Sequence, residues 1–408
     1  MKIPASWRLL GAFVVLILAG PGDASAETRT IARQGRGFLE VVDGSKVLHL
    51  KGSAREMGIQ HGVLLRDDIR AQVRYLFDVK AKQFKPEVFG LKVPIDAKRL
   101  MSSISELQKR YVPAKYYDEM RGIAEGAGVA IEEIVAANFI PELFHCSGFA
   151  LSGSATRDGL LYHGRILDYG CDWRLQDHAV LVVAEPEGAI PFVNVTYAGF
   201  IGSVTGMNAK KVSIGEMGGG GTGHWEGVPM ALLVRMALEE ADGLDEAVAV
   251  FRDHPRTCQY FYVVADGNSG RAVGMEASWN AFVTIKMGEA EPRLPHPVKD
   301  GVLLSVGKRY EELARRVKAG LGSFDDESAR RLMDRPVAMS SNLHNVLFET
   351  TTGRFWVANA STDGQPAANQ PYHAFRLDDL LRHEADTTAP ALPEPGKADG
   401  RAVGIVVQ

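Results

Sequence analysis

The sequence is poor in cysteine: its 408 residues include three, and none of them forms a CxxC pair. No HExxH spacing occurs either. These spacings mark common zinc and dithiol sites, so we expect no metal and no cofactor. A basic surplus is also missing, because 46 lysines and arginines stand against 50 aspartates and glutamates. That balance argues against nucleic acid as a partner.

Long apolar runs and heptad repeats are lacking as well. Beyond residue 26 no segment has the roughly 20 apolar residues needed to cross a bilayer. The first 26 residues differ, because Lys2 and Arg8 precede an apolar run at residues 9–18, and the small residues Ala-Ser-Ala end at Ala26. This pattern is typical of a signal peptide cut after Ala26, although an uncleaved anchor has similar features. We expect an exported protein, periplasmic or secreted, without stable membrane insertion.

The stretch from residue 27 to 145 has mostly helical periodicity. Alternating apolar residues at 39–50 predict a short strand or hairpin. Apolar side chains then recur at helical spacing between residues 56 and 84, again from Tyr117 to Ala127, and again at 131–139. We therefore treat residues 27–145 as a helical N-terminal segment.

From Cys146 to residue 386 the pattern changes to short strands. Runs such as SGFALSG, HAVLVVAE and YFYVVAD are β-branched or aromatic and are bounded by glycine-rich turns. Amphipathic helices are predicted at 228–251, 310–321 and 326–333. Two batches of strands with helices between them indicate an α+β fold of stacked sheets covered by helices. Residues 387–408 begin rich in proline and glycine, and we expect a loosely ordered tail.

The densest group of reactive residues begins at His145-Cys146-Ser147. A turn at residues 157–159 returns the chain, which places Arg165 and Asp168 near the start of the strand that Cys146 opens. If the bond between His145 and Cys146 were cut, the new α-amine would lie beside its own thiol. Such an amine has a pKa of about 7.7–8.0 and can act as the base that activates the thiol. Asp168 could hold the ammonium, and Arg165 could favour the thiolate and position the substrate.

Less specific interpretations of the same residues stay open. A single cysteine at a strand start is often a small buried apolar residue, and Arg165 with Asp168 could be a structural ion pair. Three cysteines leave at least one unpaired in an oxidising compartment. Cys171 and Cys258 could form a disulfide, or each could occupy a core site.

A glycine-rich stretch and a strand histidine are two further candidate site features. Residues 217–223 are rich in glycine, but no Gly-Lys-Ser/Thr follows, which argues against a phosphate-binding loop. We expect a flexible loop near the pocket. His163 could be a metal ligand or a base, although a structural role is the more common one for such a strand residue.

The stretch CSGFALSGSATRDGLLYHGRILDY, which starts at Cys146, resembles the start of the mature chain in the peptidase C45 family of N-terminal-nucleophile (Ntn) hydrolases. This family includes the acyl-coenzyme A:6-aminopenicillanate acyltransferases and is related to phospholipase-B-like proteins, choloylglycine hydrolases and acid ceramidases. GSAREMGIQHGVLLRDDI and SSNLHNVLFETTTGRFWVANA also resemble family segments. In that superfamily a cysteine opens the mature chain and Arg-x-x-Asp follows one hairpin later. The resemblance places those roles on Cys146, Arg165 and Asp168, and implies a four-layer αββα Ntn fold.

The chain departs from the family pattern at three points. Many relatives cut after glycine, whereas His145 precedes the nucleophile here. An oxyanion-hole asparagine commonly follows the GMN-type turn, where this chain has Glu216, and an ionised carboxylate cannot donate a hydrogen bond. The Thr-Asn-His segment that many relatives carry near LLSVG is missing. Asn342 and Asn208 are the alternative oxyanion donors.

Three classes of function fit these observations. The leading one is an enzyme that cuts itself before Cys146, and then hydrolyses or transfers the acyl group of small N-acyl compounds through a thioester, with an amine as acceptor in the transfer case. The second is a phospholipase-B-like esterase or amidase that acts on lipids. The third is a binding protein on an Ntn scaffold without catalysis.

Overall fold

The computed structural model describes residues 28–83, 87–88, 91–92, 97–139, 146–221 and 223–396. The predicted signal peptide at 1–26 and the His145 side of the predicted cut lie outside these ranges. No helix within them is long and apolar enough to cross a membrane.

The described strands form two large sheets and one small hairpin. In the ten-stranded sheet all neighbours are antiparallel except β3 and β8, which pair in parallel. The ten strands, in spatial order, are β1 (Thr28–Gln34), β2 (Gly37–Val42), β3 (Ser45–Gly52), β8 (Ala179–Pro186), β9 (Phe192–Tyr197), β10 (Thr205–Asn208), β11 (Val212–Gly221), β12 (Gln259–Asp266), β13 (Arg271–Ser278) and β14 (Phe282–Lys286). The six-stranded sheet consists of β15 (Gly301–Leu304), β6 (Ser147–Gly153), β7 (Gly159–Leu167), β16 (His344–Glu349), β17 (Arg354–Asn359) and β18 (His373–Arg376). The hairpin pairs β4 (Glu87–Val88) with β5 (Leu91–Lys92).

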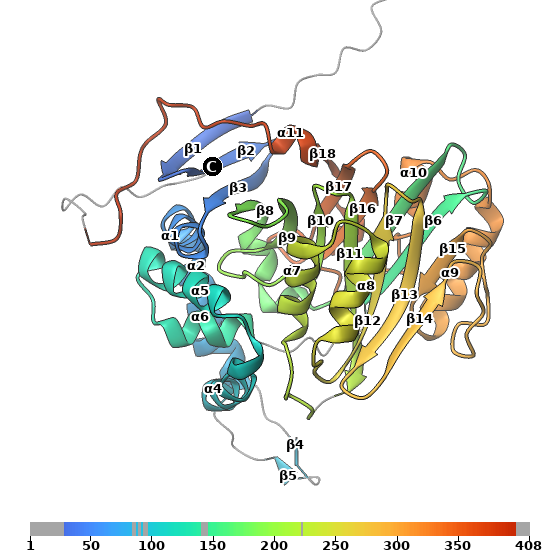
Figure 1. The fold of residues 1–408 in the computed structure, drawn as a ribbon, viewed down its shortest axis with the longest axis horizontal. Helices are drawn as coiled ribbons and strands as arrows, with labels where there is room; N and C mark the ends of the chain where they lie inside the picture. Colours follow the sequence, from blue (N-terminus) through green and yellow to red (C-terminus); the bar gives the residue numbers. More distant parts are fainter. Residues whose placement is uncertain are drawn as a thin grey trace, which may run out of the picture.

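The two large sheets pack face to face, and helices cover both outer faces (Figure 1). Strands β11 and β12 lie against β6 and β7. Helices α7 (Met230–Glu240) and α8 (Leu244–Asp253) cover the ten-stranded sheet, while α9 (Gly307–Gly320) and α10 (Asp326–Arg331) contact the six-stranded sheet. This arrangement confirms the α+β class and the four αββα layers predicted from the sequence.

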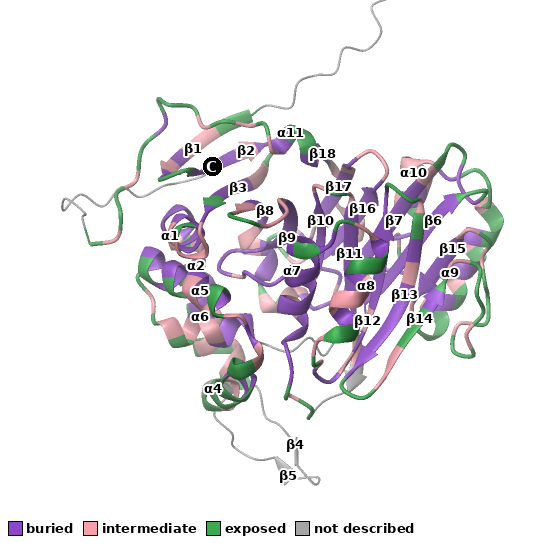
Figure 2. Cartoon of the chain, in the orientation of Figure 1, coloured by how far each residue is buried: buried purple, intermediate pink, exposed green. Residues whose placement is uncertain are grey.

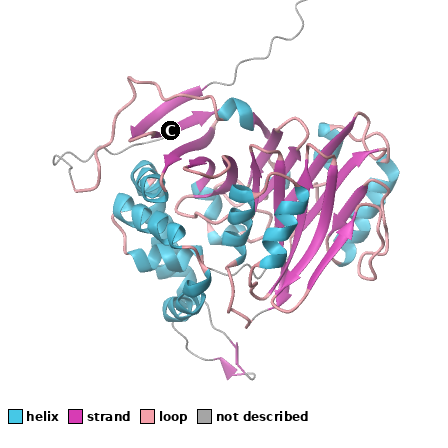
Figure 3. Ribbon diagram, in the orientation of Figure 1, coloured by secondary structure: helices cyan, strands magenta, loops and turns pink. Residues whose placement is uncertain are grey.

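The remaining helices mostly precede Cys146 and gather at one end of the sheets (Figure 3). They are α1 (Ala54–Leu64), α2 (Arg66–Tyr75), the π-helical turn η1 (Leu76–Lys80), α3 (Ala81–Gln83), α4 (Ala97–Gln108), η2 (Lys109–Tyr111), α5 (Ala114–Ala127) and α6 (Ile131–Asn138). Short elements later in the chain are η3 (Cys171–Trp173), η4 (Leu175–His178), η5 (Ala367–Asn369) and α11 (Leu377–Leu380).

Strand β8 shows why the central strands are apolar on both faces. Val180, Val182 and Ala184 belong to the core beneath the helices. Leu181 and Val183 point the other way and pack in a cluster that includes residues of the six-stranded sheet. Because a strand in the middle of four layers has no solvent face, its apolar run is continuous instead of alternating. Figure 2 shows this burial of the central strands.

Helices α1 and α5 approach so closely that only glycine fits at their contact. An added Cβ at Gly58 would lie 2.1 Å from the carbonyl oxygen of Glu119, and one at Gly62 would lie 2.4 Å from that of Ile123. Gly122 and Gly126 meet the same constraint from the α5 side. The glycines, spaced four residues apart on both helices, therefore let the two backbones touch.

Parts of this architecture differ from the sequence-based predictions. The helix expected over residues 56–84 is interrupted at Leu65, where α1 ends and α2 begins. Strands β1, β10, β15, β16 and β18 and helix α4 were not predicted. Residues 387–392 are not a loose tail, because Arg33 of β1 donates its backbone N–H to Pro390 and accepts one from Leu392.

A buried ion network connects the helices before Cys146 with the layers after it. Arg235 on α7 contacts Glu119 on α5 at 3.0 Å and Glu239 on its own helix at 2.7 Å. Lys115 contacts Glu239 from α5 at 2.6 Å. The Arg235, Glu119 and Glu239 side chains are at most 3% exposed, so salt in the solvent screens this network weakly.

The glycine contact gives a direct stability test. Gly58→Ala should lower the free energy of unfolding by about 2 kcal/mol or more, because overpacking forces the two backbones apart. Gly243→Ala is the matched control, since its added Cβ would meet one atom at an ordinary 3.7 Å and its backbone is extended. Urea unfolding of both variants measures the difference. Equal stabilities would show that α1 and α5 do not pack as described.

The buried ring of His61 predicts how stability changes with pH. Its Nε2 accepts the backbone N–H of Gly199 at 2.9 Å, and burial, with Arg235 nearby, lowers its pKa to about 3. The unfolded ring binds a proton below about pH 6.5, so the unfolded state gains protons first as the pH falls. The free energy of unfolding should therefore fall between about pH 6.5 and 3, by at most about 1.4 kcal/mol per pH unit for this ring.

His61→Gln keeps a hydrogen-bond acceptor but removes the titrating ring. Its urea-unfolding stability, followed from about pH 7 to 4.5, should fall less steeply than that of the wild type. The difference between the two curves isolates His61 from other titrating groups. Parallel curves would mean that the native ring takes up a proton in the same range as the unfolded one.

Candidate active site

Cys146 immediately precedes β6, is 4% exposed, and lines a cavity of about 330 Å³. The cavity opens between the end of β11 and the segment that leads from β15 into α9. Its lining combines apolar side chains with a few polar ones: Cys146, Met217, Gly218, Gly219, Gln259, Phe261, Ile285, Glu291, Arg293, Leu294, Leu304, Ser305, Val306 and Gly307. A predominantly apolar hollow with a few polar groups is the usual form of a small-molecule site.

The β6–β7 hairpin forms as predicted and determines what lies beside Cys146. Ser147 pairs with Ile166, and Gly148 pairs with Arg165. The start of β6 therefore lies next to the end of β7, where Arg165 and Asp168 are located. Local sequence alone was sufficient to place these residues together.

The Arg165 side chain is fully buried between the two sheets. Its guanidinium lies 3.6 Å from the carboxylate of Glu216 on β11, which is also fully buried. Gly215 makes room for it, because a Cβ there would lie 3.1 Å from Arg165 Cδ. Glu216 is therefore the counter-charge of Arg165, which explains an acidic residue where a donor was expected.

Asp168 is 2% exposed and has partners on both carboxylate oxygens. Its Oδ1 accepts the backbone N–H of Met339 at 2.9 Å, and its Oδ2 pairs with Arg309. Burial raises the pKa of Asp168, and the positive charge of Arg309 opposes that shift. Arg309 is thus the first of several groups that favour the ionised form of Asp168, ahead of the Met339 N–H and the charge of Arg165.

Arg309 joins the predicted site residues but was not predicted from the sequence. It lies in the first turn of α9 and also donates to Ser147 Oγ at 2.6 Å. It therefore links the residue after Cys146 to Asp168. No local signal could have identified it, because 162 residues separate it from Ser147.

The two candidate oxyanion donors are committed to other partners. The side-chain amide of Asn208 donates to the carbonyls of Leu238 and Ala241 at 3.0 and 2.8 Å. That of Asn342 donates to Leu167 and His344 carbonyls at 3.1 and 3.2 Å. Neither side chain lines the Cys146 cavity. The structure therefore does not support either residue as an oxyanion donor.

The Ser305 hydroxyl belongs to the cavity wall, in the region where the family pattern predicts an asparagine. Ser305 follows β15, lines the cavity with Cys146, and lies 2.7 Å from Ser147 Oγ. A hydroxyl can donate a hydrogen bond. Ser305 is therefore a donor at the position near LLSVG where the Thr-Asn-His segment is missing.

The glycine-rich stretch is strand and not the expected loop up to Gly221, where β11 ends. Met217, Gly218 and Gly219 lie in the cavity wall. Arg293 and Glu291 also line the cavity, and Arg293 is paired with Glu276 at 2.7 Å and with Glu291 at 3.0 Å.

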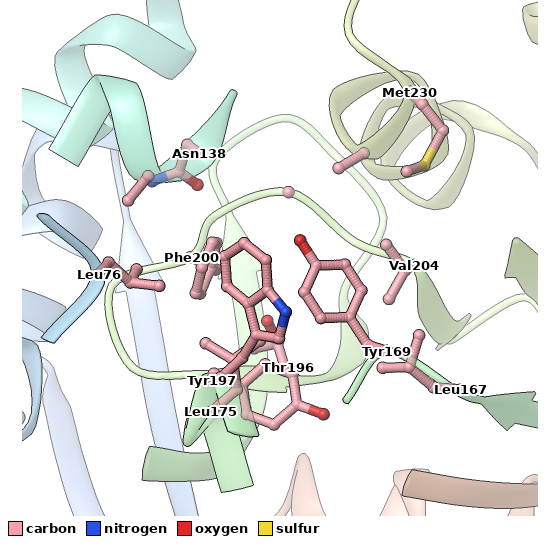
Figure 4. A pocket seen from close by; sticks show the side chains of 14 residues that line it. Leu76, Asn138, Leu167, Tyr169, Leu175, Thr196, Tyr197, Phe200, Val204 and Met230 are labelled. Carbon is pink, nitrogen blue, oxygen red and sulfur yellow. The ribbon is translucent and has the colours of Figure 1, made fainter. Parts of the chain in front are cut away.

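A second, apolar cavity of about 80 Å³ lies beside the same strand end. Figure 4 shows its aromatic lining, which includes Tyr169, Tyr197 and Phe200. Leu167 and Val204 also line it, and the Val204 carbonyl accepts a hydrogen bond from Arg165 at 3.5 Å. Arg165 is therefore hydrogen-bonded to one residue of this cavity's lining.

The other reactive side chains have structural partners. His163 is fully buried, contacts Ser213 Oγ at 2.8 Å, and has its pKa lowered to about 3 by burial and by Arg165. This agrees with the structural role and not with a base. Cys171 and Cys258 do not form a disulfide. Cys258 is buried and Cys171 is partly exposed.

Removal of Arg309 tests how much the site depends on it. Arg309→Met leaves the buried Asp168 without its cation, which should cost about 3 kcal/mol of unfolding free energy. Arg315→Met is the control, because Arg315 lies on the same helix, is 68% exposed, and pairs at the surface with Glu312. Its denaturation midpoint should match the wild type. A similar midpoint for both variants would mean that the Asp168 pair contributes no stability.

The chain is similar to several known proteins at low sequence identity. The family model of acyl-coenzyme A:6-aminopenicillanic acid acyl-transferase matches residues 155–291. Protein dcd1B of Dictyostelium discoideum is 24% identical over 387 residues, which cover 86% of this chain and 76% of that protein. The N-acylethanolamine-hydrolyzing acid amidase of Rattus norvegicus is 26% identical over 188 residues, which cover 44% of this chain and 51% of the amidase.

Among solved structures, the Caenorhabditis elegans ortholog of the same amidase matches with a TM-score of 0.40 and 18% identity, over 50% of this chain and 93% of the other. In the match to the rat amidase, by contrast, this chain spans only about half of the amidase's length. The region that the acyl-transferase family model matches begins nine residues after Cys146 and includes Arg165, Asp168 and Glu216. The family match confirms the resemblance predicted from the sequence, to the acyl-coenzyme A:6-aminopenicillanate acyltransferase family of Ntn hydrolases.

Proposed function

We propose that this protein is an Ntn cysteine enzyme that cleaves the C–N bond of small N-acyl compounds. The observation that carries the proposal is the position of Cys146. Cys146 lines a cavity of ligand size at the start of β6, and the hairpin register places the start of β6 beside the end of β7, which carries Arg165 and is followed by Asp168. The relatives named as amidases support an amide substrate.

The proposed activation begins with a cut between His145 and Cys146. In the uncut chain the Cys146 nitrogen is a peptide amide and has no basicity to offer. Hydrolysis converts it into an α-amine, whose pKa of about 7.7–8.0 suits a base near neutral pH. Asp168 would then hold the ammonium form, and Arg309 would keep Asp168 ionised.

The proposed catalytic step is acyl transfer to the thiol. The α-amine takes the thiol proton, and sulfur attacks the substrate carbonyl carbon. When the tetrahedral intermediate collapses, the C–N bond breaks and the leaving amine receives the proton. Water or a second amine then attacks the thioester and frees the thiol. Ser305 is the hydroxyl best placed along the cavity wall to donate to the oxyanion.

The cavity favours a substrate with an apolar acyl part and a small polar part. Met217, Phe261 and Leu304 give it an apolar wall, whereas Gln259 and Arg293 give it a polar side. The rat relative is named for hydrolysing N-acylethanolamines, which combine these two features. We further propose that the protein is exported, on the basis of the pattern in residues 1–26.

Intact-mass measurement of the purified protein tests the proposal. The wild type should appear as two pieces, residues 27–145 and 146–408, that stay associated without a covalent bond. Cys146→Ala should remain one chain and lose turnover of N-acyl amines. Cys171→Ala is the matched control, because it also removes a thiol from the described part of the chain, and it should still be cut and active.

Two outcomes would contradict the proposal in different ways. An uncut wild type that turns over substrate would exclude the α-amine as the base but leave Cys146 as a nucleophile. A cut protein whose Cys146 reacts with a thiol reagent no faster than an ordinary cysteine at any pH would favour a binding protein. Phospholipids in the same substrate panel test the esterase alternative.

A further inference from the structure

A second polar cluster lies in the edge strands of the ten-stranded sheet, and none of its residues lines the Cys146 cavity. It consists of Glu40 on β2, His49 on β3, and His383 just after α11. Figure 1 shows α11 beside the ends of β2 and β3. Nothing in the proposed reaction requires these residues.

The three side chains converge on one point. His49 Nε2 lies 2.9 Å from Glu40 Oε1, and His383 Nδ1 lies 2.7 Å from the same oxygen. One nitrogen of each ring and one carboxylate oxygen all lie within 4.8 Å of one another. The side chains of Glu40, His49 and His383 are 2%, 9% and 29% exposed.

The surrounding structure fixes the orientation of these groups. In the β2–β3 ladder Glu40 is opposite Val47 and Phe38 is opposite His49. Glu40 and His49 are therefore diagonal neighbours on one face of the sheet. Phe38 stacks on the His49 ring with centroids 4.1 Å apart and planes 6° apart, which restricts the ring's rotation. The backbone N–H of His383 donates to Leu380 at 3.2 Å.

We propose that Glu40, His49 and His383 bind a divalent transition-metal ion of the zinc class. Two imidazole nitrogens with one carboxylate oxygen are a donor set that such ions prefer, whereas Mg²⁺ and Ca²⁺ prefer oxygen ligands alone. Tetrahedral Zn²⁺ with bonds near 2.0–2.1 Å separates its ligand atoms by about 3.3 Å. The two short contacts need to open by about 0.5 Å to admit the ion. Water can supply the fourth ligand on the partly exposed side of His383.

The three ligands could not be recognised as one site from their spacing in the sequence. His49 and Glu40 are nine residues apart, but His383 is 343 residues from Glu40. The ligands therefore match no local motif, and the expectation of no metal rested on local motifs. Only the docking of the C-terminal segment on β1 and β2 brings the third ligand into place.

The proposed ion would connect the two pieces that the cut creates. Glu40 and His49 precede Cys146, and His383 follows it. A metal bound by all three is thus a clamp between the pieces, and this role rests on the proposed cut. The binding site itself does not depend on the cut, because the same ligands meet in the uncut chain.

Metal binding by full-length protein tests the site. After chelator treatment and dialysis, titration with Zn²⁺ should give one ion per chain, and Zn²⁺ should raise the unfolding temperature. His383→Ala should weaken binding by about 100-fold or more, since outer-shell changes alone cost about 10–100-fold. His373→Ala is the matched control: its ring contacts Asp43 at 3.0 Å on the neighbouring edge, and binding should be unchanged. Glu40→Gln is a second ligand variant if His383→Ala does not fold.

The same titration with Co²⁺ separates this site from the thiols. A spectrum without a thiolate charge-transfer band supports nitrogen and oxygen ligands. Substoichiometric binding, equal affinity in the ligand variants, or a thiolate band would each overturn the proposal. Cys146→Ala protein should bind Zn²⁺ like the wild type. Normal Zn²⁺ binding by a chain that is never cut would contradict only the proposed processing.

Discussion

The structure depends on how closely the two sheets approach one another at β7 and β11. Gly215 has no side chain, and a Cβ there would be 3.0 Å from His163 and 3.1 Å from Arg165. The space that this glycine leaves admits the aliphatic part of Arg165, whose guanidinium lies 3.6 Å from Glu216; both side chains are fully buried. Two charges removed from water are stable only when each compensates the other, so β7 of one sheet and β11 of the other have to keep their positions relative to each other. The hairpin partner of β7 is β6, and Cys146 immediately precedes it.

Arg165 and Asp168 are three residues apart in the sequence, but the structure gives them different surroundings. Arg165 faces the interior between the sheets, where Glu216 lies 3.6 Å away. Asp168 faces the outer helical layer, where Arg309 and the Met339 backbone bind it. The nearest counter-charges therefore differ, but the two groups are coupled, because the positive charge of Arg165 also lowers the pKa of Asp168. The two close partners of Asp168 suit a group that must keep a fixed position while a neighbouring proton moves.

The sequence predicted the features that local chain geometry determines. The strand SGFALSG, the turn after it, and the return strand with Arg165 are set by short apolar runs and turn residues within about 25 positions. Arg309 could not be predicted, because only the packing of α9 on the six-stranded sheet brings it to Ser147 and Asp168. Asn208 and Asn342 were plausible donors by residue type, but their amides satisfy buried carbonyls at strand and helix ends. The same long-range packing orders residues 387–392, whose composition indicated a loose tail.

The layers also explain why a cut before Cys146 would leave the protein assembled. Strand β3 lies before the cut and β8 after it, yet they pair in parallel from Val47 to Gly52 within one continuous sheet. On the other side of this region Arg235 holds Glu119 across the helical contact. Because both connections lie outside the immediate surroundings of Cys146, cleavage would change the charge on one nitrogen without removing a layer. The contacts that hold the two pieces together are therefore distinct from the His145–Cys146 peptide bond, whose hydrolysis would create the α-amine base.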